Sequence, residues 1–115
     1  MRQIVDEREQ PGIGELNGIP NSTEEIALEV AKIYGIAEES ELYRRRSSHR
    51  QARSVFIELC RRCLIRKMRT VELGRKLGNI SGSAIYLNRK RLEEAMKDNR
   101  HLRQLFQRLE RNLKR

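Results

Sequence analysis

Apolar residues recur every three to four positions along most of this chain, which is the spacing of one face of an α-helix. The longest such segment runs from Arg50 to about Lys67, and its apolar stripe is Ala52, Val55, Phe56, Leu59 and Cys63. The charged side chains of this segment are expected on its other faces: Arg53, Glu58, Arg61, Arg62 and Arg66. No stretch alternates apolar and polar residues at every second position, so strands are not expected. The pattern predicts an all-α fold, a bundle of about six helices.

Short polar residues and glycines mark the ends of the other helices. Ser22 with Glu25 forms a capping box that opens a first helix, and Gly35 supplies its left-handed end. A short second helix or turn is expected from Glu38 to Tyr43. Thr70 caps a helix that runs through Leu77 and is ended by Gly78-Asn79. Ser81 caps the next helix, from Gly82 to about Met96, and Asp98 or Asn99 starts the last one. In the helix from Gly82, the residues expected to face inward are Ile85, Leu92 and Met96. In the last helix they are Leu102, Leu105, Phe106, Leu109 and Leu113, and in the first helix they are Ile26, Val30, Ile33 and Tyr34.

Residues 1–21 differ from the rest, because they are charged and then interrupted by Gly and Pro. We expect a flexible tail or the remnant of a linker there, and one helical domain over residues 22–115. Hydrophobic residues make up 37% of the 115 residues and aromatic residues only 4%, with no Trp. The core should therefore be thin and mainly aliphatic.

Charge is distributed unevenly along the chain. Residues 1–41 hold three basic and ten acidic residues, a net charge of −7, whereas residues 42–115 hold 22 basic and six acidic residues, a net charge of +16. Such asymmetry indicates a nucleic acid or an anionic membrane as partner, without choosing between them. No apolar run approaches the roughly 20 residues of a membrane span, and no secretory segment opens the chain. A helix that lies on a membrane would expose Leu and Phe, whereas here the apolar stripes are needed for the core, so no membrane partner is expected.

The segment from Thr70 to Met96 has the outline of a helix-turn-helix: a short helix, a tight turn that contains Gly, and a longer helix. Gly74 fits this outline, because two crossing helices need a small residue at their closest approach. Ser81 and Ser83 place hydroxyl groups at the start of the second helix, where bases and phosphates would lie. The alternative is a plain helical hairpin within a bundle.

A basic loop precedes the long helix and would form the second half of a DNA grip. It contains Arg44, Arg45, Arg46 and Arg50, and Arg53 follows on the helix itself. Arginine-rich arms enter a minor groove or hold phosphates. The alternative for the loop, taken alone, is a solvated run of charge.

Several runs of residues carry a resemblance to a known family. They are Glu25-Ile26, Val30-Ala31-Lys32-Ile33-Tyr34-Gly35-Ile36, Leu42 with the arginine loop, Ala52-Arg53, Val71-Glu72-Leu73-Gly74-Arg75-Lys76-Leu77-Gly78 and Lys90-Arg91-Leu92-Glu93. From Glu24 onward the chain resembles the C-terminal DNA-binding domain of the bacterial replication initiator DnaA. It is still more similar to the DnaA-like tail domain of REP-associated single-tyrosine transposases.

The resemblance implies an all-helical fold with a helix-turn-helix in a tryptophan-repressor-like arrangement, and sequence-specific binding of double-stranded DNA. It places Ser81, Ser83 and Tyr86 at base-facing positions, and Thr70 and Val71 where the first helix of the motif touches the groove. It places Arg91 at a phosphate position, beside Lys90, which adds charge to the same face. The minor-groove arginine of the initiator aligns with Ser47, and a slip of one residue would give that role to Arg46 or Arg45.

One run departs from the initiator. Where the initiator has Gly-Gly-Arg-Asp-His-Thr-Thr, this chain reads Gly78-Asn79-Ile80-Ser81-Gly82-Ser83-Ala84-Ile85. The departure favours the transposase-associated tails, so we expect a fragment of a transposase-related protein in the bacterial cytoplasm, at the nucleoid. Origin binding of the initiator type is one alternative. A general module for RNA or anionic membrane is another, and a helical protein–protein adaptor is a third.

Nothing in the sequence predicts catalysis. Cys60 and Cys63 form a CxxC pair in the middle of a helix, away from the helix N-terminus that redox pairs use, and His49 and His101 lack the spacing of a zinc site. The chain has no Gly-Lys-Ser/Thr phosphate loop and no His-x-His pair, and Tyr34, Tyr43 and Tyr86 are interpreted as packing or contact residues. We expect no enzyme, no cofactor, no metal and no small-molecule substrate, and a monomer.

Overall fold

The computed structural model describes residues 22–44 and 48–113, and within them the only regular structure is helical. The elements are α1 (Thr23–Tyr34), the 3₁₀ helix η1 (Glu39–Tyr43), α2 (Arg50–Leu64), α3 (Thr70–Lys76), α4 (Gly82–Asp98) and α5 (Arg100–Leu113). The expectation of an all-α fold is confirmed for the described residues. The predicted tail, residues 1–21, lies outside them.

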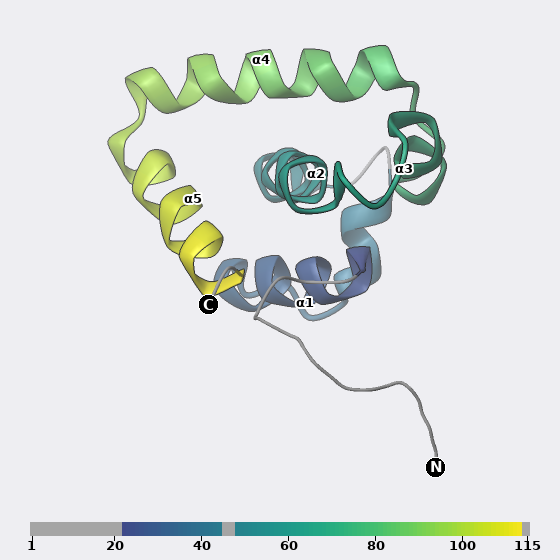
Figure 1. Ribbon diagram of the computed structural model, residues 1–115. Helices are drawn as coiled ribbons and strands as arrows, with labels where there is room; N and C mark the ends of the chain where they lie inside the picture. Colours follow the sequence, from purple (N-terminus) through teal and green to yellow (C-terminus); the bar gives the residue numbers. More distant parts are fainter. Residues whose placement is uncertain (1–21, 45–47, 114–115) are drawn as a thin grey trace.

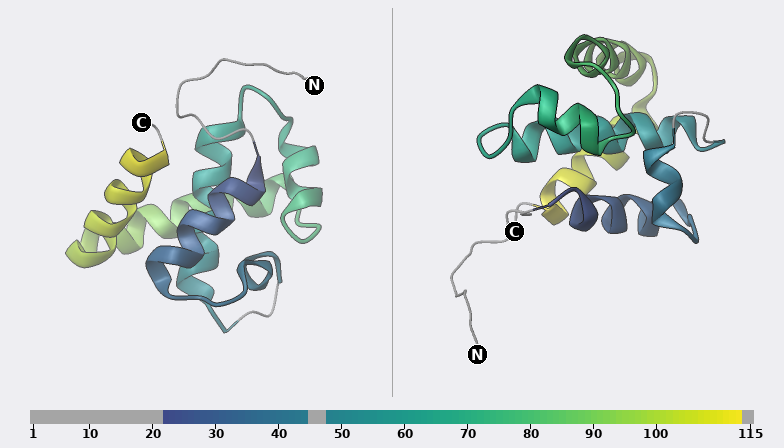
Figure 2. Two further views of the ribbon diagram at one scale, coloured as in Figure 1. Left: turned by 90° about the horizontal axis from the view of Figure 1, so that it is seen from below. Right: turned by 90° about the vertical axis from the view of Figure 1, so that its right-hand side faces the viewer.

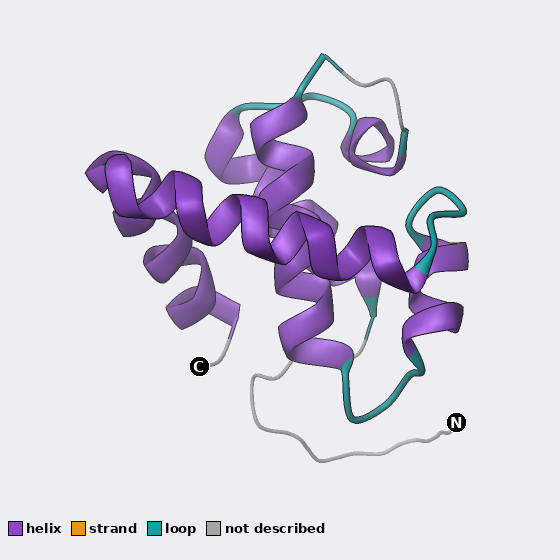
Figure 3. Ribbon diagram, turned by 90° about the horizontal axis from the view of Figure 1, so that it is seen from above, coloured by secondary structure: helices purple, strands orange, loops and turns teal. Residues whose placement is uncertain are grey.

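Helix α2 is the centre of the fold. Figure 1 looks along α2, with α4 above it, α1 below it, α5 joining these two on one side and α3 on the other. The right-hand view of Figure 2 shows the same layering from the side, and Figure 3 shows α4 lying across α2. Other helices therefore cover α2 on both of its sides, which explains why apolar residues occupy so much of its surface.

The core is aliphatic, with two phenylalanines. Phe56 and Leu59 of α2, Ile26 of α1, Ile85 of α4 and Phe106 of α5 are all almost fully buried. The ring of Tyr43 meets Phe56 edge to face, with 5.1 Å between the ring centroids. Most of the inward residues expected from the sequence are buried, and the rest are partly buried against the same cluster: Ile33, Tyr34, Cys63, Met96 and Leu105.

Three of the predicted helix ends are confirmed by hydrogen bonds or dihedral angles. Ser22 Oγ accepts from the backbone N–H of Glu25 at 3.3 Å, and Ser81 Oγ accepts from that of Ala84 at 3.1 Å. Gly35 ends α1 in the left-handed region with φ 69°. These caps are decided within three residues of chain, which is why the sequence predicts them.

Two other ends differ from the prediction. Thr70 is the first residue of α3 and not its cap, because the carboxylate of Glu72 accepts from the backbone N–H of Arg69 at 3.1 Å and so places the helix start one residue earlier. Helix α2 ends at Leu64 instead of Lys67, since Leu64 O accepts from the N–H groups of both Lys67 and Met68 in a closing turn.

The corner between α4 and α5 consists of one residue. Helix α4 runs to Asp98 and α5 begins at Arg100. Asn99 Oδ1 accepts from the backbone N–H of Leu102 at 3.0 Å, so Asn99 is the cap of the two that were expected. Arg103 donates across the corner to Met96 O at 3.1 Å, which ties the two helices together.

Glu58 corrects the expected outer face of α2, because it is completely buried. Arg61 holds its carboxylate through Nε and Nη2, both at 2.9 Å, and Arg62 Nε donates to it at 2.7 Å. Arg62 also donates to Glu110 of α5 at 2.9 Å and lies 4.8 Å from the ring centroid of Phe106. A buried carboxylate with several charge-assisted hydrogen bonds is satisfied. Arg62 also connects α2 to α5, through its hydrogen bond to Glu110.

Candidate nucleic-acid interface

The turn between α3 and α4 is held closely against α3. Gly74 O accepts from the backbone N–H groups of Leu77 and Ile80, at 3.2 and 2.9 Å. A Cβ atom on Gly74 would collide with the carbonyl oxygen of Ile80. Gly74 therefore makes a close approach, but to the backbone of the turn and not to a crossing helix as expected.

Two consecutive left-handed residues shape this turn. Gly78 has φ 95° and Asn79 has φ 61°, the conformation that Gly and Asn adopt most readily. A Cβ on Gly78 would also collide with the carbonyl oxygen of Tyr43, the residue before Arg44. The start of the arginine loop therefore lies beside the α3–α4 turn, although the two are more than 30 residues apart in sequence.

Arg53 supports the turn from α2. Its Nη2 donates to Leu77 O at 3.1 Å, and the side chain is partly buried. The sequence predicts Arg53 as a DNA contact, whereas this hydrogen bond gives it a positioning role: it satisfies a carbonyl at the end of α3 that the helix leaves without a partner.

The rotation of α4 about its own axis is fixed by one polar pair. Ser54 Oγ donates to Asn88 Oδ1 at 2.8 Å, and Asn88 Nδ2 donates back to Ser54 O at 3.0 Å. Together with the buried side chains of Ile85 and Leu92, this pair determines which residues of α4 face away from α2.

The residues that face away include the DNA contacts predicted on α4 and at its cap. Ser81, Ser83, Tyr86, Lys90 and Arg91 are all exposed. Tyr86 and its neighbour Leu87 are large side chains that are 47% and 46% exposed. Lys90 and Arg91 have no ion-pair partner among the described residues. The α4 outer face consists of five of these side chains: Ser83, Tyr86, Leu87, Lys90 and Arg91.

Helix α3 adds to the same region. Thr70 is partly buried, and its methyl group lies 3.2 Å from where a Cβ of Gly82 would be, so the beginnings of α3 and α4 are in contact. Val71 is 58% exposed. Arg75 and Lys76, for which the sequence predicts no DNA contact, are exposed at the end of α3. They lie between the buried residues Leu73 and Leu77, and this spacing in the sequence indicates their exposure.

The arginine loop is only partly described. Arg44 is exposed and lies 3.4 Å from the carboxylate of Glu41, and Arg50 is the exposed first residue of α2. Arg45 and Arg46 fall outside the described residues. Of the predicted contacts, the structure thus sets Thr70 beside the start of α4 and the start of the loop beside the α3–α4 turn.

Acidic residues are absent from the first part of α4. Residues 82–91 contain Arg89, Lys90 and Arg91 and no carboxylate, whereas residues 92–98 contain Glu93, Glu94, Lys97 and Asp98. Arg89 Nε donates to Glu93 at 3.1 Å and Lys97 lies 3.4 Å from Glu94. The unpaired positive charge of α4 is therefore that of Lys90 and Arg91, on the α4 outer face.

No family model, curated protein or solved structure matches this chain. What the surface binds is therefore inferred from its own side chains.

The other chemically suggestive residues have structural partners. Both cysteines are free thiols, and burial raises the pKa of Cys60 well above its usual value, which disfavours the reactive thiolate. Tyr34 donates to Gln51 at 2.8 Å and burial raises its pKa to about 12. Tyr43 donates to Thr23 at 3.1 Å. Among the described residues no group of three or more side chains could hold a metal ion, and none of their helices is long and apolar enough to cross a membrane.

Proposed function

We propose that this protein binds double-stranded DNA in a sequence-specific manner, with α3, its turn and α4 acting as a helix-turn-helix. In this arrangement α4 enters the major groove with its outer face, and α3 lies across the backbone with Thr70 and Val71 at the groove edge. Arg44, Arg45, Arg46 and Arg50 hold phosphates or enter the adjoining minor groove. The protein acts as a monomer and not as an enzyme.

The observation that carries this proposal is the composition of the α4 outer face. It combines hydroxyl and phenol groups, which exchange hydrogen bonds with base edges, an exposed Leu87, which suits the methyl group of thymine, and two unpaired cations for phosphates. No carboxylate repels DNA within residues 82–91. Interactions that face inward, above all Asn88 with Ser54, keep this set of side chains on one side of the helix.

A fold of the tryptophan-repressor or DnaA C-terminal type belongs to the same proposal. We assign the chain to a transposase-related protein of the bacterial nucleoid, on the resemblance of residues 78–85 to the transposase-associated tails. Binding to replication origins is the alternative within this class, and the two differ in the DNA sequence that is preferred.

Selection of binding sites from random duplex DNA tests the proposal directly. We expect enrichment of a defined site, and an affinity that falls by about a thousandfold between 50 and 200 mM salt if about six phosphates are contacted. Enrichment of an origin box would favour the initiator alternative. No enrichment together with a steep salt dependence would indicate a general polyanion module and contradict the proposal.

Point variants then separate base readout from charge. Ser83→Ala and Tyr86→Phe should weaken binding to the selected site by about 1–3 kcal/mol and leave binding to random duplex nearly unchanged. Arg50→Gln should weaken both by the same factor, because a phosphate contact is insensitive to sequence. Ser40→Ala, at an exposed position of η1, is the matched control for the loss of a hydroxyl group and should change neither. An unchanged ratio of specific to non-specific affinity in the first two variants would refute the assignment of α4.

A further inference from the structure

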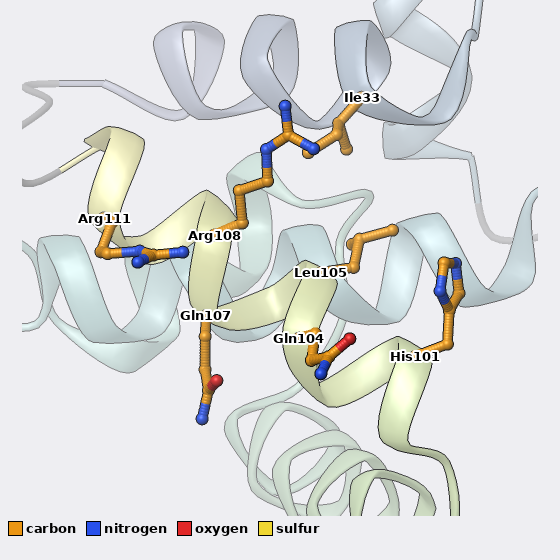
Figure 4. A pocket seen from close by; sticks show the side chains of 7 residues that line it. All are labelled: Ile33, His101, Gln104, Leu105, Gln107, Arg108 and Arg111. Carbon is orange, nitrogen blue, oxygen red and sulfur yellow. The ribbon is translucent and has the colours of Figure 1, made fainter.

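A groove of about 590 Å³ runs between α1 and α5, away from the α4 outer face. Figure 4 shows it, with Arg108 extending toward Ile33 of α1 and Gln104 and His101 projecting from α5. A second hollow of about 550 Å³ shares Ile33 and Arg108 with it and continues along α1 to Lys32 and Asn112. The two hollows share these two lining residues, and together we call them the α1–α5 groove.

The polar lining of this groove consists of groups that donate hydrogen bonds to phosphate. The main part is lined by Arg108, Arg111, His101, Gln104 and Gln107, and no carboxylate lines it. Arg108 and Arg111 have no ion-pair partner among the described residues. The one acidic residue of α5, Glu110, is turned inward to Arg62. Glu29, in the continuation, lies 3.9 Å from Lys32 and is partly neutralised by it.

The apolar part of the groove is small. It consists of Ile33 and Leu105, both partly buried, and no aromatic side chain lines it. Protein partners are usually anchored by aromatic or large apolar side chains in well-packed pockets, and two aliphatic side chains provide little of that. Arginine, glutamine and asparagine side chains are the groups that position proteins on the sugar–phosphate backbone.

We propose that the α1–α5 groove binds the phosphate backbone of a second DNA duplex, so that one protein molecule bridges two duplexes. The bridging rests on the proposed function of α4, whereas the phosphate contact at the groove does not. Helix α5 begins at the end of α4 and runs to α1, which packs on the opposite side of α2 from α4 (Figure 1). The two DNA-binding surfaces therefore lie on different sides of the molecule.

Co-capture of two duplexes tests the proposal with the full chain. A biotinylated duplex that carries the selected site is immobilised, protein is added, and a fluorescent duplex of random sequence is offered at low salt. The wild-type protein should retain the fluorescent duplex while light scattering shows that the free protein is a monomer. Arg108→Gln/Arg111→Gln should retain only background fluorescence and still occupy the biotinylated duplex.

Lys97→Gln/Arg100→Gln is the matched control, because it removes the same charge from the α4–α5 corner and leaves the groove and the Arg103 hydrogen bond intact. Circular dichroism checks that both variants keep their helix content, as expected for substitutions by Gln at exposed positions. Equal loss of co-capture in both variants would mean that only overall charge matters, and this would overturn the proposal. Bridging that persists without Arg108 and Arg111 would do so as well.

Chemical-shift mapping separates this proposal from the function assigned to α4. As duplex is added, signals of Tyr86 and Lys90 report on the α4 outer face, and the Nε–H signals of Arg108 and Arg111 report on the groove. Shifts at the arginines support the phosphate contact at the groove even if α4 stays silent, whereas bridging requires shifts at both surfaces. Groove signals that do not respond to duplex, but shift when residues 1–21 are deleted or an acidic peptide is added, would assign the groove to another occupant.

Discussion

The two halves of α4 have opposite electrostatic character and different neighbours. Residues 82–91 pack on α2 through Ile85 and Asn88 and present two unpaired cations to solvent. Residues 92–98 carry the acidic side chains, and Glu93 there lies 4.0 Å from Arg62 of α2. Arg62 is in turn bound to the buried Glu58 and to Glu110 of α5.

The comparison teaches how a strongly basic chain divides its charge. Around the second half of α4, arginines of α2 pair with carboxylates and hold the helices together. Hydrogen bonding to Glu58 raises the pKa of Arg61. The pKa of Arg62 is raised too: its burial acts against this, but its hydrogen bonds to Glu58 and Glu110 outweigh the burial. In the first half, positive charge without a carboxylate contributes little to the fold and is available to a polyanion.

The largest loss of stability is expected at Arg62. Arg62→Met removes the partner of Glu110 and one of the two partners of the completely buried Glu58, so the free energy of unfolding should fall by about 4 kcal/mol. Arg91→Met, in the other half of the comparison, should change it by no more than about 0.5 kcal/mol. Urea denaturation measures both, and equal effects would erase the distinction between the two kinds of arginine.

Gly74→Ala is expected to have the next largest effect. Its new methyl group meets the backbone carbonyl of Ile80, which cannot move without opening the turn, and the cost should be about 2–3 kcal/mol. Gly82→Ala is the control, because the atom nearest to its new methyl is the side-chain methyl of Thr70, which can rotate away. Thermal unfolding of the two variants compares them, and an unaffected Gly74→Ala would show that the turn is loose.

Asn88→Ala tests the link between the fold and the α4 outer face. It removes both hydrogen bonds to Ser54 and should lower the free energy of unfolding by about 1–2 kcal/mol. Because α4 then lacks the hydrogen bonds that fix its rotation about its own axis, the ratio of specific to non-specific DNA affinity should fall. The fall should exceed what the loss of stability alone explains. Gln51→Ala removes an amide that accepts a hydrogen bond from Tyr34 of α1, and it should leave this ratio as it is.

The smallest effect on stability is expected for Lys90→Gln/Arg91→Gln, within about 0.5 kcal/mol of zero. Its effect on DNA binding should be clear: the slope of log affinity against log salt should become shallower by about two units, one for each phosphate contact. Lys97→Gln removes a cation that already has Glu94 beside it and should leave the slope nearly unchanged. A slope that is the same in all three proteins would place DNA elsewhere.

Local features of this fold were predictable from the sequence, and features that depend on distant partners were not. The caps at Ser22 and Ser81 act within three residues, and the orientation of Ser83, Tyr86 and Lys90 follows from helical spacing around Ile85. Glu58 was placed on an exposed face because its burial depends on Arg62, whose further partner Glu110 lies 48 residues away.

The same reason accounts for what was missed at the candidate site. The role of Arg53 depends on a carbonyl 24 residues away, which no periodicity reveals. The sequence does indicate one wall of the α1–α5 groove. Polar residues recur there at helical spacing: His101, Gln104, Gln107, Arg108 and Arg111. That spacing shows a shared polar face, but the facing wall, Ile33 of α1, is supplied only by the tertiary fold.

The single-residue corner at Asn99 has a geometric consequence for DNA. With Asn99 capping α5 and Arg103 bound to Met96 O, the directions of α4 and α5 are locked to each other. Two duplexes held at the α4 outer face and the α1–α5 groove would therefore cross at one fixed angle and with one handedness. The protein would then act as a rigid joint that imposes a defined crossing on DNA, and lengthening the corner by glycines would loosen that crossing without removing either contact.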